Sequence, residues 1–97
     1  MTRDNALKGL LLEEHALDVD ELASACEVAP EWVIERVHAG LLSCTSTGGE
    51  MRFASAQLVR ARRMATTERR FDANQELAAL VADLLEEVEQ LRRRLRK

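Results

Sequence analysis

Two short stretches of patterned polar and apolar positions, between residues 18 and 40, predict two helices joined by a tight turn. Asp18 is expected to be the N-cap of the first helix, with Glu21 completing a capping box, and this helix is expected to end near Cys26–Glu27. Pro30 suits the first position of the second helix, and Gly40 suits the residue just beyond its end. The positions expected to face inward are Leu22, Ala25 and Cys26 on the first helix and Val33, Val37 and Leu41 on the second. Two helices and a turn within about 20 residues have the dimensions of a helix-turn-helix.

The following stretch, residues 41–53, is typical of a β-hairpin. A cluster of turn-forming residues, Thr45–Gly49, separates the short runs Leu42–Cys44 and Met51–Phe53. A two-stranded ribbon that follows a helix-turn-helix is a wing. Ahead of the first helix, Leu10–Leu12 fits either a short strand or a helical turn.

Two further helices are predicted in the second half of the chain. Ser55 is expected to cap a helix that runs to about Arg69, and Asp72, with Gln75, is expected to cap a last helix that runs to the terminus. The last helix would span about 24 residues and about 36 Å. Its apolar positions recur at alternating spacings of four and three, which is a coiled-coil seam; they are Leu77, Val81, Leu84, Val88, Leu91 and Leu95, widened by Leu80 and Leu85.

The apolar stripe fits both packing within the chain and dimerisation, which are compatible. Because this helix is too long to bury its whole stripe on so small a body, we expect it to pair with a second copy of the chain. The residues expected to form the dimer seam are Leu84, Val88, Leu91 and Leu95. The predicted fold is mainly α, a winged helix-turn-helix with a short β wing and a long C-terminal coiled-coil helix. The predicted domains are residues 1–70, the winged helix-turn-helix, and residues 71–97, the dimerisation helix.

Charge is unevenly distributed along the 97 residues, whose formal net charge is −3. Residues 1–54 contain four basic and ten acidic residues, whereas residues 55–97 contain ten basic and seven acidic ones. An acidic N-terminal half is a poor match to a phosphate backbone, because non-specific affinity for nucleic acid comes from cations. The basic run at the C-terminus fits either complementarity with the helix dipole or a patch for an anionic partner.

The composition also limits where in the cell the protein is expected to act and which activities it is expected to have. No signal peptide or membrane-spanning stretch is apparent, and Cys26 and Cys44 lack metal-site spacing, so we expect a cytoplasmic protein with two reduced thiols. His15 and His38 are the two histidines, and neither lies in a catalytic motif. We therefore expect no enzyme activity, no metal and no cofactor.

The order of these parts resembles the layout of MerR-type proteins. Within that superfamily, the chain most resembles the bacterial chaperone-modulator CbpM family, over about residues 17–96. The matching features are Glu21–Ala23 through Val28 to Gly40–Leu42, with Glu35 and Val37 ahead of Gly40, then Phe53, Phe71–Asp72, the run Leu77–Leu85 and the leucine-rich end. Glu27 stands where both groups usually have a turn glycine.

The resemblance implies a function in the bacterial cytoplasm. CbpM-like proteins bind the J-domain of the co-chaperone CbpA, a DnaJ homologue, and block its stimulation of DnaK. The expected partner is therefore a CbpA-like J-domain, bound by a homodimer with no membrane involved, and the expected activity is inhibition by occlusion of a basic J-domain surface.

MerR regulators read DNA with an Arg-Tyr-Tyr segment on the second helix, and here the matching positions are Ile34, Glu35 and Arg36. The leading arginine is absent, and Glu35 would face phosphate in a groove, which should weaken binding. The alternative function is nevertheless a small MerR-like DNA-binding transcriptional regulator. Its phosphate contacts would come from the wing and the third helix; they are Arg52, Arg60, Arg62 and Arg63. A third hypothesis is a coiled-coil adaptor for an unrelated protein.

The outer face of the second helix is the candidate partner-binding surface. If Val33 and Val37 point inward, Ile34 points outward with the acidic residues, and Trp32 lies at the edge. A tryptophan among carboxylates suits a basic protein partner. The alternative is that Trp32 packs on the wing or the N-terminal segment while the carboxylates are solvated. The predicted contact residues are Glu31, Trp32, Glu35 and His38.

Overall fold

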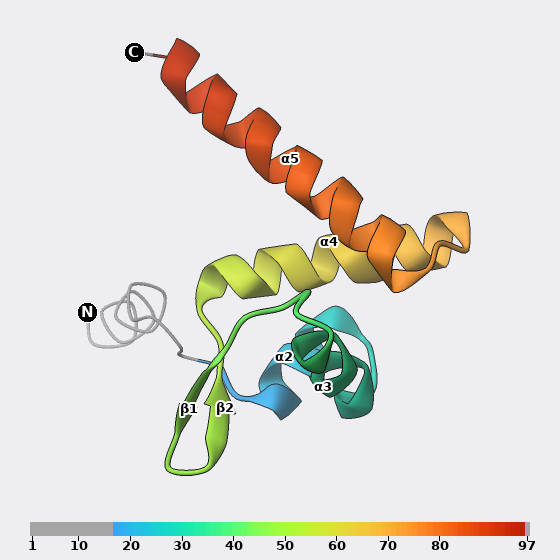
Figure 1. Ribbon diagram of the computed structural model, residues 1–97, viewed down its shortest axis with the longest axis vertical. Helices are drawn as coiled ribbons and strands as arrows, with labels where there is room; N and C mark the ends of the chain where they lie inside the picture. The colour runs from blue at the N-terminus through green and yellow to red at the C-terminus, as the bar shows by residue number, and fades with distance from the viewer. Residues whose placement is uncertain (1–16, 97) are drawn as a thin grey trace, which may run out of the picture. The chain divides into compact units, whose positions relative to one another are not determined.

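The computed structural model describes residues 17–96, in which four helices and one small sheet follow each other along the chain (Figure 1). The chain forms two compact units. The first unit ends at Arg62 and the second begins at Arg63. The predicted boundary between residues 70 and 71 stays a prediction. The predicted strand or turn at Leu10–Leu12, and His15, lie outside the described residues.

Helices α2 (Val19–Cys26) and α3 (Pro30–His38) form the helix-turn-helix of the first unit. The predicted capping box is confirmed: the Asp18 carboxylate accepts from the Glu21 backbone N–H at 2.8 Å, and Glu21 Oε1 accepts from the Asp18 backbone N–H at 2.9 Å. Pro30 stands at the start of α3 as predicted. Gly40 follows the end of α3 with a φ of 79°, a conformation that glycine adopts without steric cost.

The turn between the two helices depends on an unusual backbone conformation at Glu27. This C-cap residue of α2 has a φ of 58° and a ψ of 46°, in the left-handed region. Its N–H group bonds back to the carbonyls of Ala23 and Ser24, which satisfies acceptors at the helix end. Glu27 therefore adopts a left-handed backbone conformation at the position where the families that the chain resembles usually have glycine.

Strands β1 (Thr45–Thr47) and β2 (Glu50–Arg52) form the wing, an antiparallel pair in which Ser46 lies opposite Met51. The predicted turn, Thr45–Gly49, was therefore too long. The two residues between the strands, Gly48 and Gly49, both take positive φ, which suffices for a tight hairpin, and this leaves the β-branched threonines free to extend the strand.

The wing is joined to the start of the described chain through Phe53. This residue follows β2 and forms an isolated bridge with Leu17, through hydrogen bonds of 3.1 and 2.7 Å, rather than continuing the hairpin as predicted. Its side chain is fully buried. The core of this unit is apolar, as expected; its buried members include Leu22, Ala23, Cys26, Val33, Leu42 and Phe53.

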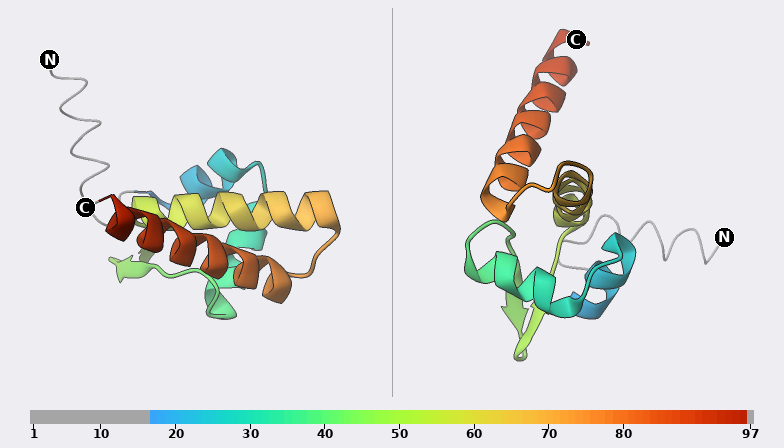
Figure 2. Two further views of the ribbon diagram at one scale, coloured as in Figure 1. Left: turned by 90° about the horizontal axis from the view of Figure 1, so that it is seen from above. Right: turned by 90° about the vertical axis from the view of Figure 1, so that its right-hand side faces the viewer.

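Helix α4 (Ser55–Phe71) crosses the boundary between the two units as one continuous helix (Figure 2). Its first residue is Ser55, so the predicted cap is displaced by one position: the Ala54 carbonyl accepts from the backbone N–H groups of Gln57 and Leu58. Within the first unit, Arg60 Nε donates to the Leu41 carbonyl at 2.7 Å, and the Gln57 side chain accepts from Ser43 N–H at 2.8 Å. The loop after α3 is thereby held on α4.

Helix α5 (Gln75–Leu95) completes the second unit. Its N-cap is Asn74, whose side chain accepts from the Leu77 N–H at 2.8 Å, and not Asp72 as predicted. Asp72 instead takes a φ of 51° in the turn after α4, a conformation that its short polar side chain tolerates. The predicted fold, a mainly α winged helix-turn-helix, is confirmed.

Candidate functional site

The outward face of α3 presents a stripe of polar side chains. Glu31, Glu35 and His38 are exposed and follow one another at spacings of four and three, so they share one side of the helix. Ile34 and Trp32 beside them are half-buried, and Val33 on the opposite side is fully buried. The four predicted contact residues thus lie on one helix, and their role in binding stays a prediction.

A stacked pair of side chains borders this stripe. The guanidinium carbon of Arg36 lies 4.1 Å from the centroid of the Trp32 ring, and Arg36 Nη1 donates to the Trp32 carbonyl oxygen at 3.2 Å. Such a cation–π contact is worth about 0.5–1 kcal/mol at exposed sites and more when desolvated. Trp32 is therefore oriented by its own helix.

This stack corrects one expectation about α3. Val37 was predicted to point inward, but it is half-buried, whereas Arg36 is only 8% exposed. The long aliphatic stem of arginine can cover apolar surface while its charged end stays bonded, so a residue counted as polar takes a buried position. The spacing Trp-x-x-x-Arg, one helical turn, is the sequence signal that could have predicted the contact.

The electrostatic character of the face is acidic. Arg36 Nη1 lies 3.4 Å from Glu35 Oε1, yet the Glu35 side chain remains 72% exposed, whereas that of Arg36 is mostly buried. An exposed ion pair of this kind contributes little to stability. The carboxylates of Glu31 and Glu35 therefore remain available to a cationic surface brought against α3.

The four arginines proposed for phosphate contacts differ in their surroundings. Arg52 donates to Glu50 within the wing at 2.9 Å, and Arg60 donates to the Leu41 carbonyl. Arg62 is exposed, with Nε 3.4 Å from the Ala25 carbonyl, and Arg63 pairs with Glu89 on α5. Three of these cations thus already bond to groups within the chain, which reduces the positive charge that this part of the chain would offer to DNA.

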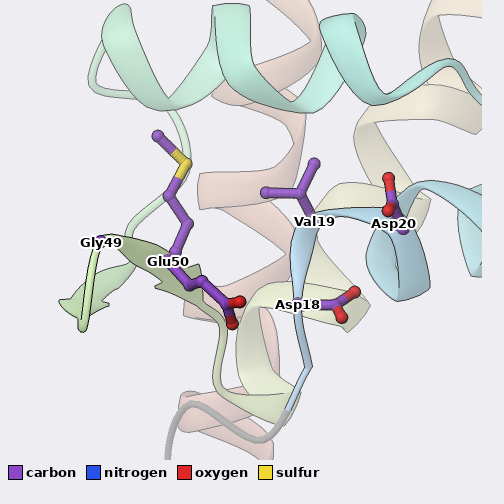
Figure 3. A pocket seen from close by; sticks show the side chains of 6 residues that line it. Asp18, Val19, Asp20, Gly49 and Glu50 are labelled. Carbon is purple, nitrogen blue, oxygen red and sulfur yellow. The ribbon is translucent and has the colours of Figure 1, made fainter.

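A pocket of about 380 Å³ lies between the start of α2 and the tip of the wing (Figure 3). Its walls carry acidic side chains around an apolar part; the lining residues are Asp18, Val19, Asp20, Gly49, Glu50 and Met51. Asp18 and Glu50 already accept hydrogen bonds from Glu21 N–H and Arg52. The pocket therefore adds to the acidic character of this unit.

Metal sites, disulfides and membrane-spanning helices are further features that the described part of the chain could contain. Residues 17–96 contain no group of three or more histidine, cysteine, aspartate or glutamate side chains that could hold a metal ion. Cys26 is buried and Cys44 half-buried, and the two are not joined by a disulfide. Among the described helices, none is long and apolar enough to cross a membrane.

The residues predicted for the dimer seam belong to the second unit. Leu84, Val88, Leu91 and Leu95 are all exposed, with exposed fractions of 57, 41, 46 and 85%. They lie on α5, in the second unit, whereas the predicted partner-binding residues lie on α3, in the first. The structure contains one copy of the chain, and the dimer stays a prediction.

The chain matches a known protein family. A family model described as MerR HTH family regulatory protein matches residues 17–97. Neither the curated proteins nor the solved structures include a match to this sequence.

Proposed function

Because the chain belongs to the MerR HTH family of regulatory proteins, we propose that it regulates by binding another protein through the exposed face of α3. One observation carries this proposal. At the helix that enters the DNA groove in a helix-turn-helix protein, this chain exposes the carboxylates of Glu31 and Glu35 beside the Trp32–Arg36 stack. Carboxylates repel phosphate, whereas they attract a basic protein surface.

The partner that we propose is the J-domain of a DnaJ-type co-chaperone of the CbpA kind. The resemblance to the CbpM family supports this choice. J-domains carry a basic helix with which they engage DnaK, so an acidic face laid over that helix would block the stimulation of DnaK. The mechanism is occlusion, and it requires neither catalysis nor a cofactor.

The geometry of the α3 residues supports a role for each of them in the proposed contact. Trp32 supplies a large, pre-oriented contact surface of the kind that often dominates an interface, because Arg36 fixes its ring. Glu31 and Glu35 supply the charge that guides and aligns a basic partner. His38, exposed at the end of the stripe, extends the contact.

The second candidate function is DNA binding, which the family description and the wing favour. A glycine-tipped wing and the exposed Arg62 are features that such a regulator would use. The acidic α3 face and the internal bonds of Arg52, Arg60 and Arg63 argue against it.

The test is calorimetric titration of the chain with a purified CbpA-type J-domain, at low and at high salt concentration. We expect saturable binding that weakens as salt rises, because the attraction between the two surfaces is electrostatic. An absence of binding at tens of micromolar would refute the proposal. Selection of bound fragments from genomic DNA then tests the alternative.

A matched pair of variants locates the contact. Glu35→Lys should weaken J-domain binding about tenfold or more, because it places a cation against a basic surface. Glu76→Lys makes the same charge change at an exposed position in the first turn of α5, and it should leave the affinity within about twofold. Equal losses in the two variants would show that net charge, and not the α3 face, governs binding. If the protein binds DNA instead, Glu35→Lys should preserve or strengthen that binding.

A further inference from the structure

The pocket of about 380 Å³ between the start of α2 and the tip of the wing is lined by no residue of α3. We call it the α2–wing pocket. In Figure 3 the start of α2 forms one side of it and the wing, with Gly49 and Glu50, forms the other, and both sides belong to the first unit. Ligand pockets have volumes of about 300–1,000 Å³, so this one suits a single side chain or a small molecule and not a whole helix.

Part of the pocket wall is apolar. Val19 is the first residue of α2 and Met51 is the middle residue of β2, and both side chains are half-buried. Methionine has three rotatable bonds and adapts its shape to the group that it contacts. Together these two side chains can cover a short aliphatic chain that enters between α2 and the wing.

Every ionisable residue that lines the pocket is acidic; these residues are Asp18, Asp20 and Glu50. Asp18 caps α2 through one oxygen, but a carboxylate accepts about four hydrogen bonds, so it retains capacity for a further donor. The positive end of the α2 dipole is equivalent to about half an elementary charge, and Arg52 pairs with Glu50. Three carboxylates outweigh both of these positive contributions, so the pocket attracts cations.

The construction of the pocket indicates which cation fits. Residues 17–96 contain no group of three or more histidine, cysteine, aspartate or glutamate side chains that could hold a metal ion, so the carboxylates of the pocket do not converge on one point. A fitting cation carries an apolar part of its own, which Val19 and Met51 would cover. Lysine and arginine side chains have this construction, an aliphatic stem with a charged end.

The rim of the pocket is open on the side of the wing tip. A Cβ atom built on Gly49 would meet no other atom within 4 Å, so no side chain blocks the approach there. A backbone that carries a basic side chain can therefore cross the wing tip while the side chain enters the pocket.

We propose that the α2–wing pocket binds the side chain of a lysine or arginine that a partner protein presents in an extended segment. The aliphatic stem lies against Val19 and Met51, and the charged end donates hydrogen bonds to the carboxylates on the two sides of the pocket. Because no residue of α3 takes part, this binding does not depend on the proposed contact with a J-domain.

The test is a titration of the full chain with capped tripeptides, followed by two-dimensional NMR of the backbone amides. An alanine–lysine–alanine peptide should shift the amides of Val19, Gly49 and Met51 saturably, with a dissociation constant of about 1–10 mM, and its arginine counterpart should bind similarly. The norleucine peptide has the stem without the charge, and methylammonium has the charge without the stem. Each should bind at least about tenfold more weakly than the lysine peptide.

Three outcomes of this titration would overturn the proposal. The first is an absence of saturable shifts at the pocket with the lysine peptide. The second is equal binding of the norleucine peptide, which would mean that the carboxylates do not recognise the charge. The third is equal binding of methylammonium, which would mean that a negative surface attracts any cation and that the apolar wall has no role.

A matched pair of variants locates the binding. Asp20→Asn keeps the shape of an exposed lining residue but removes its charge, and it should weaken binding of the lysine peptide about threefold to tenfold. Asp72→Asn makes the same change at an exposed position in the second unit, where asparagine tolerates the φ of 51°, and it should leave the affinity within about twofold.

The amide spectrum of each variant shows whether it is folded, and Glu50→Gln repeats the test from the wing side of the pocket. Equal losses of affinity in Asp20→Asn and Asp72→Asn would show that net charge governs binding, and this result would overturn the assignment to the α2–wing pocket.

Discussion

The helix-turn-helix and the long helix α5 differ in whether they bury their large apolar side chains. In α2 and α3 the large side chains Leu22 and Val33 are fully buried, and the outer face carries carboxylates. In α5 the buried positions are alanines, and leucines such as Leu84 lie in water. The first arrangement is complete within one chain. The second has the pattern of half an interface, in agreement with the prediction that Leu84, Val88, Leu91 and Leu95 form a dimer seam.

The prediction with the largest expected effect disrupts the buried core of the helix-turn-helix. Leu22→Ala should lower the free energy of unfolding by about 2–5 kcal/mol, because it leaves a cavity at a fully buried position. The measurement is urea denaturation, monitored by circular dichroism, at a protein concentration where the chain is monomeric.

Leu84→Ala is the matched control, because it removes the same atoms from a position that is 57% exposed. In the monomer it should cost less than about 1 kcal/mol, since little apolar area is lost from the interior. If the predicted dimer seam on α5 pairs with a second copy, the cost of Leu84→Ala should grow with protein concentration. Equal costs for Leu22→Ala and Leu84→Ala in the monomer would show that the contrast between the two regions is wrong.

A second prediction concerns the capping box that starts α2. Asp18→Ala should destabilise the first unit by about 1 kcal/mol, because the Glu21 backbone N–H loses its acceptor at 2.8 Å. Asp18→Asn retains a side-chain oxygen at this position and should cost only a few tenths of that amount. Thermal denaturation measures both variants. A loss as large in Asp18→Asn as in Asp18→Ala would show that the carboxylate acts through its charge and not as a cap.

The features that could be predicted from sequence are those that local chemistry determines. The capping box at Asp18 and the proline that starts α3 require only residues within one helical turn, and both predictions are confirmed. The N-cap of α5 was misassigned because Asp72 and Asn74 are both good caps, and the choice depends on where α4 ends. The first wing strand was misplaced at Leu42–Cys44, because the threonines of Thr45–Thr47 were assigned to the turn although a β-branched residue suits a strand.

The candidate site could be predicted from the sequence only in part. Helical spacing alone placed Glu31, Glu35 and His38 on one exposed side, as the structure has them. The burial of Arg36 under the Trp32 ring was missed because a pattern of polar and apolar residues treats arginine as a surface residue. The pocket between α2 and the wing joins residues about 30 positions apart, and that contact depends on tertiary packing.

A third prediction sharpens the description of the turn between α2 and α3. Glu27→Gly should stabilise the first unit slightly, by roughly 0.5 kcal/mol. Glycine removes the cost of about 1 kcal/mol that a side chain incurs at a φ of 58°, and the greater freedom of the unfolded chain offsets part of that gain.

Ser24→Gly, inside α2, is the control and should destabilise by about 0.5–1 kcal/mol, since glycine there gains no strain relief. Chemical denaturation of both variants gives the comparison. Destabilisation by Glu27→Gly would mean that the glutamate side chain makes a contribution larger than the backbone strain.

The smallest expected effect belongs to the second unit and concerns the ion pair between α4 and α5. The hydrogen bond from Arg63, above all, and the charges of Arg63, Arg93 and Arg92 hold the pKa of the Glu89 carboxyl below its ordinary value. A carboxyl with a lowered folded-state pKa stabilises the fold above its unfolded-state pKa, and that contribution is lost as pH falls through the folded-state value. Glu89 is exposed, so solvent screens the pair and the effect should be small.

Glu89→Gln should therefore lower the melting temperature slightly at neutral pH and leave it unchanged in acid, where the native carboxyl is already protonated. Gln90→Ala, its neighbour on the same helix, should show no such pH dependence. If the melting temperatures of Glu89→Gln and the native chain differ equally at both pH values, the side chain acts through packing, and the pair does not hold α5 on α4 by charge.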